Sequence, residues 1–207
     1  MADLRNRTER VIEFWYEFAS TYSYPAAMRV EAVAAETGVT VQWRPFLLGP
    51  IFAEFGWTTS PFNLQPAKGA YMWHDVGRSC AKLGLAFRRP EPFPQNGLLA
   101  ARVATALPDD GRRARFTRAV YRAQFAEGLT ISEPEVIASL LATEALDAEA
   151  TLAQAADPAV KQALRAQTEV AKRHGIFGAP SWRTTADGEL FWGNDRLEEA
   201  LDWTQGL

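Results

Sequence analysis

Cysteine and histidine are scarce in this chain. Its 207 residues include one cysteine, Cys80, and two histidines, His74 and His174. A single cysteine excludes an internal disulfide, and two widely separated histidines lack the spacing of zinc ligands. Any thiol chemistry must therefore use the sulfur of a small molecule.

The chain also lacks blocks of like charge and long apolar runs. Its formal net charge is -3, and charges of both signs are spread along the sequence. This distribution argues against nucleic acid or a membrane surface as a partner. The first ten residues, MADLRNRTER, are polar, and no apolar stretch of signal-peptide or membrane-spanning length follows them. We therefore expect a cytoplasmic protein.

Hydrophobic and aromatic residues, in contrast, are plentiful. The chain is 47% hydrophobic and contains 7 Trp and 12 Phe. That is enough for one large domain, or for a compact core with a second lobe inserted into it. It also leaves aromatic rings to line a pocket.

The N-terminal part predicts a strand, a helix and a second strand. Val11 to Phe18 (VIEFWYEF) is apolar and aromatic, which is typical of a buried strand. From Ala26, apolar residues recur at helical spacing until Gly38, a helix stop signal. Val39 to Arg44 then alternates like a second strand. Together these segments form a βαβ unit.

The middle of the sequence predicts helices. An irregular loop with two glycines and two prolines spans Leu48 to Asn63, and helices are expected over Pro66 to Leu85, Asn96 to Leu107 and Arg113 to Glu127. Ser132 and Glu135 fit a capping box for another helix. Asp157, followed by proline, starts a long helix that ends near Gly175.

The C-terminal part returns to strands. Ser181 to Thr185 and Glu189 to Trp192 are short strands joined by a turn at Asp187–Gly188, and a last helix starts at Asp195. The two ends thus give βαβ and ββα. We expect an α/β fold with one domain formed by residues 1–47 and 174–207, and an inserted helical domain over residues 48–173.

Ser20 to Ser23 (STYS) lies between the first strand and the first helix. A helix N-terminus offers unpaired backbone N–H groups and a partial positive charge, which stabilise a thiolate. A serine without a neighbouring histidine is a poor nucleophile. The natural role of Ser20 is therefore to donate a hydrogen bond to an incoming thiolate. The alternative is a plain serine N-cap.

Three further positions suit a ligand, and each has a structural alternative. Pro180, in GIFGAP before a strand, indicates a cis bond or an ordinary loop proline. Asp195 either binds an ammonium group or caps the last helix. Lys68 either attracts a carboxylate or belongs to a solvated helix start, on which Asp75 and Arg78 pair with each other.

Six stretches, in order, resemble the 2-hydroxychromene-2-carboxylate isomerase family, a relative of kappa-class glutathione transferases and of DsbA-type oxidoreductases. They are FWYEFASTYSYPA, WRPFLLGPIF, SPFNLQPAKGAYMWHDVGR, PFPQNGLLAAR, GIFGAP and FWGNDRL. Each is weak alone, but together they span nearly the whole chain. The resemblance implies a thioredoxin-like core (βαβ…ββα) with a large all-helical insertion.

The resemblance also implies a glutathione site. Ser20 falls on the family's serine that hydrogen-bonds the glutathione sulfur. Pro180 falls on its cis-proline, and the preceding Ala179 pairs through its backbone with the tripeptide like an added strand. Asn194 and Asp195 fall on the segment that holds the γ-glutamyl group.

Other family contacts follow from the same resemblance. Asn63 and Lys68 fall near further glutathione and substrate contacts. One departure is Thr21, where the family has proline; it implies an extra backbone N–H and a hydroxyl beside the thiolate. Aromatic residues are expected to form the apolar wall of the substrate site, among them Trp57, Phe62, Trp73 and Phe177.

The activity implied is an isomerisation assisted by a thiol. Glutathione thiolate adds to an electron-poor carbon of a double bond, the bond rotates, and glutathione leaves. In the family this converts 2-hydroxychromene-2-carboxylate into trans-o-hydroxybenzylidenepyruvate during naphthalene breakdown. We accordingly expect a small aromatic acid as the substrate, and a homodimer.

Two alternatives stay open at this point. A kappa-like glutathione transferase or peroxidase would use the same residues. A non-catalytic thioredoxin-like binding module is the other, and the combined presence of Ser20, Lys68, Pro180 and Asp195 argues against it. A disulfide oxidoreductase is excluded because Cys80 has no partner.

Overall fold

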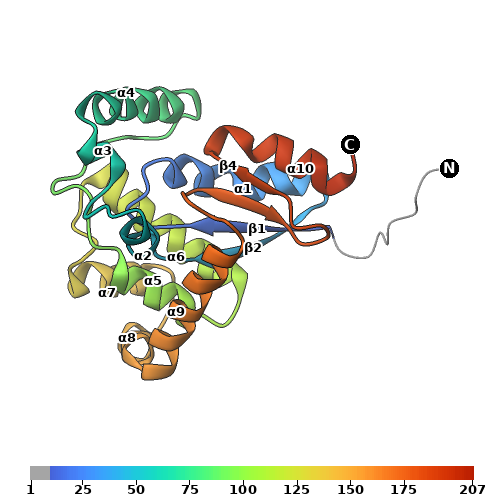
Figure 1. Cartoon of the computed structure of the whole chain (residues 1–207). Helices are drawn as coiled ribbons and strands as arrows, with labels where there is room; N and C mark the ends of the chain where they lie inside the picture. The colour runs from blue at the N-terminus through green and yellow to red at the C-terminus, as the bar shows by residue number, and fades with distance from the viewer. Residues whose placement is uncertain (1–9) are drawn as a thin grey trace.

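A four-stranded mixed sheet lies at the centre of the molecule (Figure 1). The computed structural model describes residues 10–207; residues 1–9, most of the polar N-terminal segment, lie outside the described part. The strands are β1 (Val11–Tyr16), β2 (Thr40–Pro45), β3 (Ser181–Thr184) and β4 (Leu190–Trp192), in the order β2-β1-β3-β4. β1 is parallel to β2 and antiparallel to β3, and β4 is antiparallel to β3. The two predicted halves, βαβ and ββα, therefore meet in one sheet.

Helices α1 (Ser23–Thr37) and α10 (Leu197–Gln205) pack on the sheet and against each other. A short 3₁₀ helix, η2 (Asn194–Arg196), precedes α10. The other helices fall between β2 and β3 in sequence: α2 (Leu48–Glu54), α3 (Pro61–Leu64), α4 (Pro66–Lys82), α5 (Leu98–Ala106), α6 (Asp110–Arg122), the π-helical η1 (Ala123–Glu127), α7 (Pro134–Thr143), α8 (Ala148–Ala156) and α9 (Pro158–Arg173). This arrangement confirms the predicted α/β fold with a large helical insertion. The division at residues 47 and 174 stays a prediction. Within residues 10–207, no helix combines the length and apolarity needed to cross a membrane.

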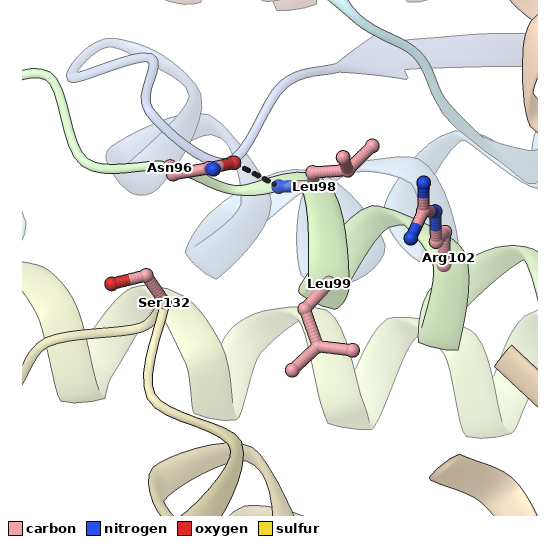
Figure 2. Close-up of a pocket in the computed structure, with 5 residues that line it drawn as sticks. All are labelled: Asn96, Leu98, Leu99, Arg102 and Ser132. Carbon is pink, nitrogen blue, oxygen red and sulfur yellow. Dashed lines mark hydrogen bonds between the residues drawn. The ribbon is translucent and has the colours of Figure 1, made fainter. Parts of the chain in front are cut away.

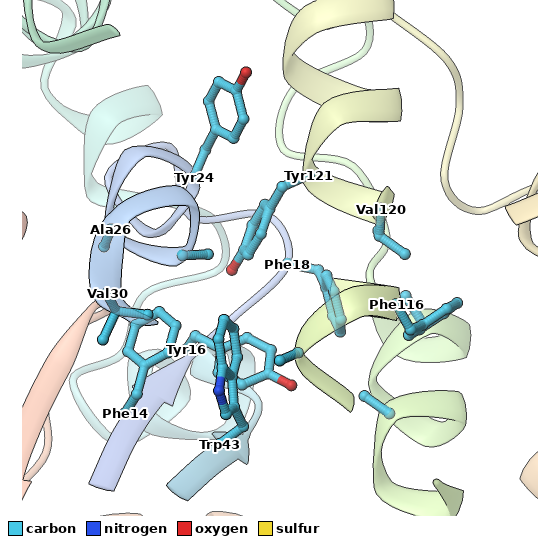
Figure 3. Close-up of a cluster of buried hydrophobic side chains, with 14 of the residues drawn as sticks. Phe14, Tyr16, Phe18, Tyr24, Ala26, Val30, Trp43, Phe116, Val120 and Tyr121 are labelled. Carbon is cyan, nitrogen blue, oxygen red and sulfur yellow. The ribbon is translucent and has the colours of Figure 1, made fainter. Parts of the chain in front are cut away.

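The main core lies between the sheet and α1, where alternate residues of β1 point (Figure 3). Phe14 is fully buried, stacks on Trp182 of β3 with ring centroids 4.5 Å apart, and meets Trp43 of β2 edge-on at 4.9 Å. The three residues are direct neighbours in the strand register. Such contacts between aromatic rings on adjacent strands fix which strands pair.

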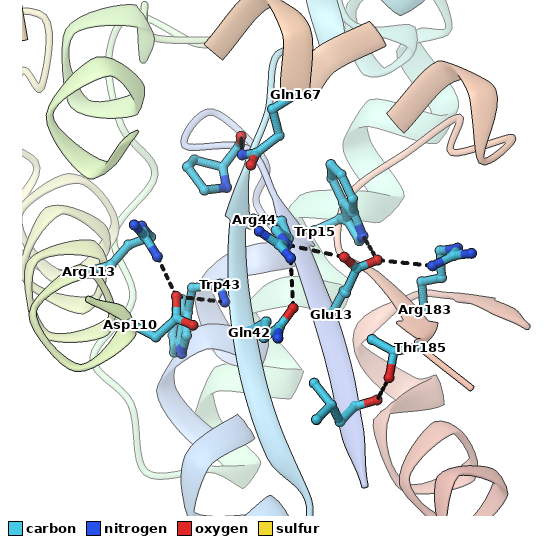
Figure 4. A network of polar contacts seen from close by, with 12 residues as sticks. Glu13, Trp15, Gln42, Trp43, Arg44, Asp110, Arg113, Gln167, Arg183 and Thr185 are labelled. Atoms are coloured by element: carbon cyan, nitrogen blue, oxygen red, sulfur yellow. Dashed lines mark hydrogen bonds and ion pairs between the residues drawn. The ribbon is translucent and has the colours of Figure 1, made fainter. Parts of the chain in front are cut away.

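The opposite face of β1 carries a buried carboxylate. Glu13 lies between Arg44 of β2 and Arg183 of β3, with oxygen-to-nitrogen distances of 3.1 and 3.3 Å (Figure 4). Trp15 on the same face donates its indole N–H to Glu13 at 3.2 Å. The charge of Glu13 is thus paired on both sides, as a carboxylate in this position requires.

Two sequence predictions in the insertion were wrong, and one helix was missed. The segment Leu48 to Asn63 is not an irregular loop but contains α2 and α3, because its prolines fall in first turns, where no backbone N–H is needed. Helix α8 was not predicted; Asp147 caps it through the N–H of Ala150 at 3.0 Å. Helix α7 begins after Glu133 without a side-chain cap, so the Ser132 capping box is absent.

Candidate active site

Ser20 lies in the turn between β1 and α1, and it meets the loop before β3. Its hydroxyl donates a hydrogen bond to the carbonyl oxygen of Ala179 at 2.8 Å. The Ser20 hydroxyl oxygen in turn accepts a hydrogen bond from the backbone N–H of Ser23 at 3.3 Å. The capping alternative therefore holds in part, but the fold also joins Ser20 to the Ala179–Pro180 segment, 159 residues away. The Ala179–Pro180 peptide bond is cis.

The next two residues carry backbone donors at the start of α1. Within residues 10–207, the N–H groups of Thr21 and Tyr22 have no hydrogen-bond acceptor. They precede the first residue of α1, at the positive end of the helix dipole. The Thr21 hydroxyl is buried and bonded to the sulfur of Met72 at 3.1 Å. The expectation that this hydroxyl lies beside a thiolate was therefore wrong, because α4 covers it.

Gly193 ties the end of β4 to Pro180. Its N–H donates to the Pro180 carbonyl at 3.0 Å, and its own carbonyl accepts the Trp182 indole N–H at 2.8 Å. Its φ of 124° lies in the region that favours glycine. These bonds set Asn194 and Asp195 beside the Ser20–Ala179 contact, although the sequence separates them widely from Ser20.

Asn194 and Asp195 have different surroundings. Asn194 receives hydrogen bonds from Arg29 of α1, one of them to its side-chain oxygen at 3.0 Å. The Asp195 side chain is 79% exposed, and Arg196 lies 3.9 Å away. Helix α10 starts at Leu197, with Arg196 as a cap that makes no side-chain bond. The capping alternative for Asp195 is thus absent, and its carboxylate is accessible.

Tyr22 connects the Ser20 turn to the helical insertion. Its ring lies 6.3 Å from that of Phe62, and its hydroxyl donates to Asp75 of α4 at 3.0 Å. Burial and then this bond raise the pKa of Tyr22, with a smaller contribution from the nearby Asp195 charge. The predicted pairing of Arg78 with Asp75 is confirmed at 3.0 Å. Sequence reasoning did not single out Tyr22.

The insertion places Asn63 and Lys68 next to Phe62. Lys68, in the first turn of α4, holds its ammonium group 5.8 Å from the centroid of the Phe62 ring. Asn63 is exposed and donates to the Thr59 hydroxyl at 3.1 Å. Phe62 thus connects both residues, through Tyr22, to the Ser20 turn. An ammonium group at this position attracts carboxylates.

The four aromatic residues that were expected to form one apolar wall pack in different places. Phe177 is 47% exposed and meets Trp192 edge-on at 5.0 Å, next to the Ala179–Pro180 segment. Phe62 lies against Tyr22. The other two pack elsewhere: Trp73 against Phe93, and Trp57 against Phe52 and Phe55. Of the four, only Phe177 and Phe62 contact the segments around Ser20.

Glu17 is a buried acid that sequence reasoning missed. Its carboxylate accepts the N–H of Ala19 at 2.9 Å, and its carbonyl accepts the N–H of Ser20 at 3.0 Å and the Tyr121 hydroxyl at 2.9 Å. Burial raises the pKa of Glu17 to about 7, which the Ala19 bond partly opposes. The available signal was an acidic residue inside the apolar run VIEFWYEF.

The Cys80 thiol is unreactive. It is buried on α4 and unpaired, and burial raises its pKa to about 11. Because the thiolate is the reactive form, this cysteine is inert at neutral pH. The protein's own sulfur therefore does not supply thiol chemistry.

Comparison with known protein families identifies the family to which this chain belongs. The DSBA-like thioredoxin domain matches residues 11–203, nearly all of the described chain. The chain belongs to this family. Two relatives of this DSBA-like protein are 2-hydroxychromene-2-carboxylate isomerase of Sphingobium xenophagum, 26% identical over 91% of this chain and 95% of the relative, and glutathione S-transferase kappa 1 of Homo sapiens, 28% identical over 91% of this chain and 88% of the relative.

The solved structures agree with this family assignment. A structure of 2-hydroxychromene-2-carboxylate isomerase superposes on this DSBA-like chain with a TM-score of 0.84, covering 95% of this chain and 94% of that one at 22% identity. At that identity the likeness shows the fold. The family resemblance and the thioredoxin-like fold inferred from the six stretches are thus confirmed.

Proposed function

We propose that this protein is a glutathione-dependent isomerase of a small aromatic hydroxy or keto acid, such as 2-hydroxychromene-2-carboxylate. The observation that carries the proposal is the contact of the Ser20 hydroxyl with the Ala179 carbonyl at 2.8 Å. It joins the turn before α1 to the Ala179–Pro180 segment, and the bond of the Gly193 N–H to the Pro180 carbonyl connects the segment that carries Asp195. The relatives named as an isomerase and as a kappa-class glutathione transferase support the same chemistry.

The residues around Ser20 fit glutathione by their chemistry. Ser20, Thr21 and Tyr22 supply one hydroxyl and two N–H donors at a helix N-terminus, which suit a thiolate. The N–H of Ala179 has no acceptor within residues 10–207, so it is available to pair with a peptide. The Asp195 carboxylate suits the ammonium group of a γ-glutamyl residue.

The chain's contribution to catalysis is to lower the pKa of a thiol and to hold an acid beside it. Bound glutathione would supply a thiolate that adds reversibly to a conjugated double bond and so permits rotation about it. The Ser20 hydroxyl must turn from the Ala179 carbonyl to reach that sulfur, since it carries one proton. Lys68 would attract a carboxylate at the rim of the site, and Phe177 and Phe62 would contact apolar parts of the ligands.

Product analysis tests the proposal directly. The protein is incubated with 2-hydroxychromene-2-carboxylate, with and without glutathione, and the organic acids and glutathione are quantified. We expect the trans-o-hydroxybenzylidenepyruvate isomer to form faster only when glutathione is present, and glutathione to remain undiminished. No acceleration would contradict the isomerase proposal. Accumulation of a glutathione conjugate would instead favour the transferase, which the 28% identical kappa-class relative makes the second candidate.

Asp195→Asn is expected to weaken glutathione binding by about tenfold or more. A charge-assisted hydrogen bond contributes roughly 1.5–3 kcal/mol, which the neutral amide would lose. Thermal stability should not change, because the side chain is 79% exposed and does not cap α10. Calorimetric titration with glutathione measures the affinity. Asp202→Asn makes the same charge change on an exposed part of α10 and should bind like the unaltered protein; equal affinity of all three would refute the role of Asp195.

The predicted homodimer and cytoplasmic location remain predictions. A soluble small-molecule substrate requires neither a membrane nor a nucleic-acid partner, in keeping with the dispersed charge of the sequence. Sedimentation of the purified chain would give its oligomeric state.

A further inference from the structure

A small cavity lies at the start of α5, in a motif that the proposed chemistry leaves without a role. Its volume is about 150 Å³, and its lining comes from the turn before α5, from α5 itself and from the segment after η1 (Figure 2): Asn96, Leu98, Leu99, Arg102 and Ser132. Four of these residues, all except Ser132, belong to the PFPQNGLLAAR stretch. Most of the cavity lining therefore comes from one of the six stretches that resemble the family.

Arg102 is the charged residue of this cavity, and it is unpaired. It is partly buried, yet within residues 10–207 it makes no hydrogen bond or ion pair. Three other partly buried arginines have carboxylate partners: Arg29 pairs with Glu198, Arg118 with Glu31, and Arg183 with Glu13. A partly desolvated guanidinium without a partner favours an anion, and its planar donors match a carboxylate.

The other polar groups of the lining are also donors. The side-chain oxygen of Asn96 accepts the N–H of Leu98 at 3.0 Å, which leaves the amide NH₂ as the free end of that side chain. The Ser132 hydroxyl does not cap α7, since Glu133 occupies the cap position. No carboxylate belongs to the lining. The cavity thus combines one cation and two neutral polar groups with the apolar side chains of Leu98 and Leu99.

The cavity also adjoins the turn that carries Ser20. Gly97 lies between Asn96 and Leu98, and a Cβ added to it would stand 2.8 Å from the Cβ of Phe18 and 3.4 Å from a carboxylate oxygen of Glu17. Only a residue without a side chain permits this approach. The Asn96–Leu98 wall is therefore packed directly against the end of the β1 segment, two residues before Ser20.

We propose that this cavity binds a single-ring aromatic carboxylate, with Arg102 pairing the carboxylate and the two leucines contacting the ring. The size is appropriate, because an enclosed apolar cavity of about 150 Å³ holds a benzene molecule, and this cavity has a similar volume but is partly open to solvent and has polar side chains in its lining, as a carboxylate on the ring requires. This proposal rests on the proposed function in one respect: the choice of an aromatic acid as the ligand follows from the proposed substrate. Binding itself is independent of glutathione.

Titration of the full chain with benzoate, in the absence of glutathione, tests the proposal. We expect benzoate to bind in the millimolar range and Arg102→Gln to weaken it roughly tenfold or more, as loss of a charge-assisted bond implies. Arg102→Lys should be intermediate, because lysine keeps the charge but lacks the planar donors. Arg165→Gln, on the exposed side of α9, is the matched control and should bind like the unaltered protein.

A neutral ligand separates the role of the charge from general damage to the cavity. Benzyl alcohol should bind the unaltered protein and Arg102→Gln equally. Failure of benzoate to bind the unaltered protein, or equal affinity in the Arg102→Gln and Arg165→Gln variants, would overturn the proposal. Arg102-dependent benzoate binding in a protein that does not bind glutathione would instead uphold the cavity and refute the proposed function.

Discussion

Ser20→Ala is expected to lower isomerase turnover roughly tenfold to a hundredfold and to raise the pKa of bound glutathione. The variant lacks the hydroxyl proposed to donate to the thiolate, and a hydrogen bond to a charged group contributes roughly 1.5–3 kcal/mol. The Thr21 and Tyr22 N–H groups would remain, so some stabilisation of the thiolate should persist. Turnover at saturating glutathione and the ultraviolet absorbance of the thiolate against pH measure the two effects.

The fold should tolerate this change. The hydroxyl bond to the Ala179 carbonyl contributes about 1 kcal/mol, typical of a neutral hydrogen bond. Ser139→Ala, on the exposed side of α7, is the matched control and should keep full activity. Ser20→Cys is expected to gain some thiol chemistry without restoring isomerisation. Full activity of the alanine variant with added glutathione would show that the role assigned to Ser20 is wrong.

Glu17→Gln is expected to change how the free energy of unfolding depends on pH. Burial raises the pKa of Glu17 from 4.5 to about 7 in the folded chain. Between these values the folded state binds more protons than the unfolded state, so stability falls as pH rises. The contribution of the protonated carboxyl is fully present below about pH 4.5 and is lost as pH rises through about 7. Glutamine keeps the acceptor for the Ala19 N–H and does not titrate.

The stability of the glutamine variant relative to the unaltered protein should therefore increase with pH. The gain between pH 5 and pH 8 should be on the order of 3 kcal/mol, from about 1.4 kcal/mol per unit of pKa difference. Urea unfolding at several pH values measures it. Glu36→Gln, at an exposed position of α1, should show no such trend. Parallel stability curves for Glu17→Gln and the unaltered protein would contradict the raised pKa.

The contrast between Glu13 and Glu17 shows what the sequence leaves open. Both are acids in the apolar run VIEFWYEF. Glu13 points to the sheet face where Arg44 and Arg183 lie on the neighbouring strands, and it is paired on both sides. Glu17 follows the end of β1, and within the described residues 10–207 the Ala19 N–H is the one hydrogen-bond partner of its carboxylate. Which acid is paired depends on strand order, because the arginines come from segments far apart in sequence.

Local signals were sufficient for much of the secondary structure. Gly38 ends α1 with a φ of 66°, and Asp157 caps α9 through the N–H of Ala159 at 2.6 Å, as expected. Such signals act within a few residues of the chain. The prolines in Leu48–Asn63 misled the prediction because proline both interrupts helices and begins them. Only the packing of α2 and α3 on their neighbours decides between these outcomes.

The sequence by itself determined the fold class, the lack of a usable protein thiol and the set of candidate site residues, since these follow from composition, local periodicity and six ordered stretches. The tertiary structure alone decided that Ser20 meets Ala179, that Gly193 holds Asp195 beside them, and that the Thr21 hydroxyl is turned away onto Met72. The Ser20–Ala179 and Thr21–Met72 contacts join residues 159 and 51 positions apart, and the Gly193–Pro180 bond closes the β3–β4 hairpin. Their geometry is set by strand register and helix packing, which no local pattern encodes.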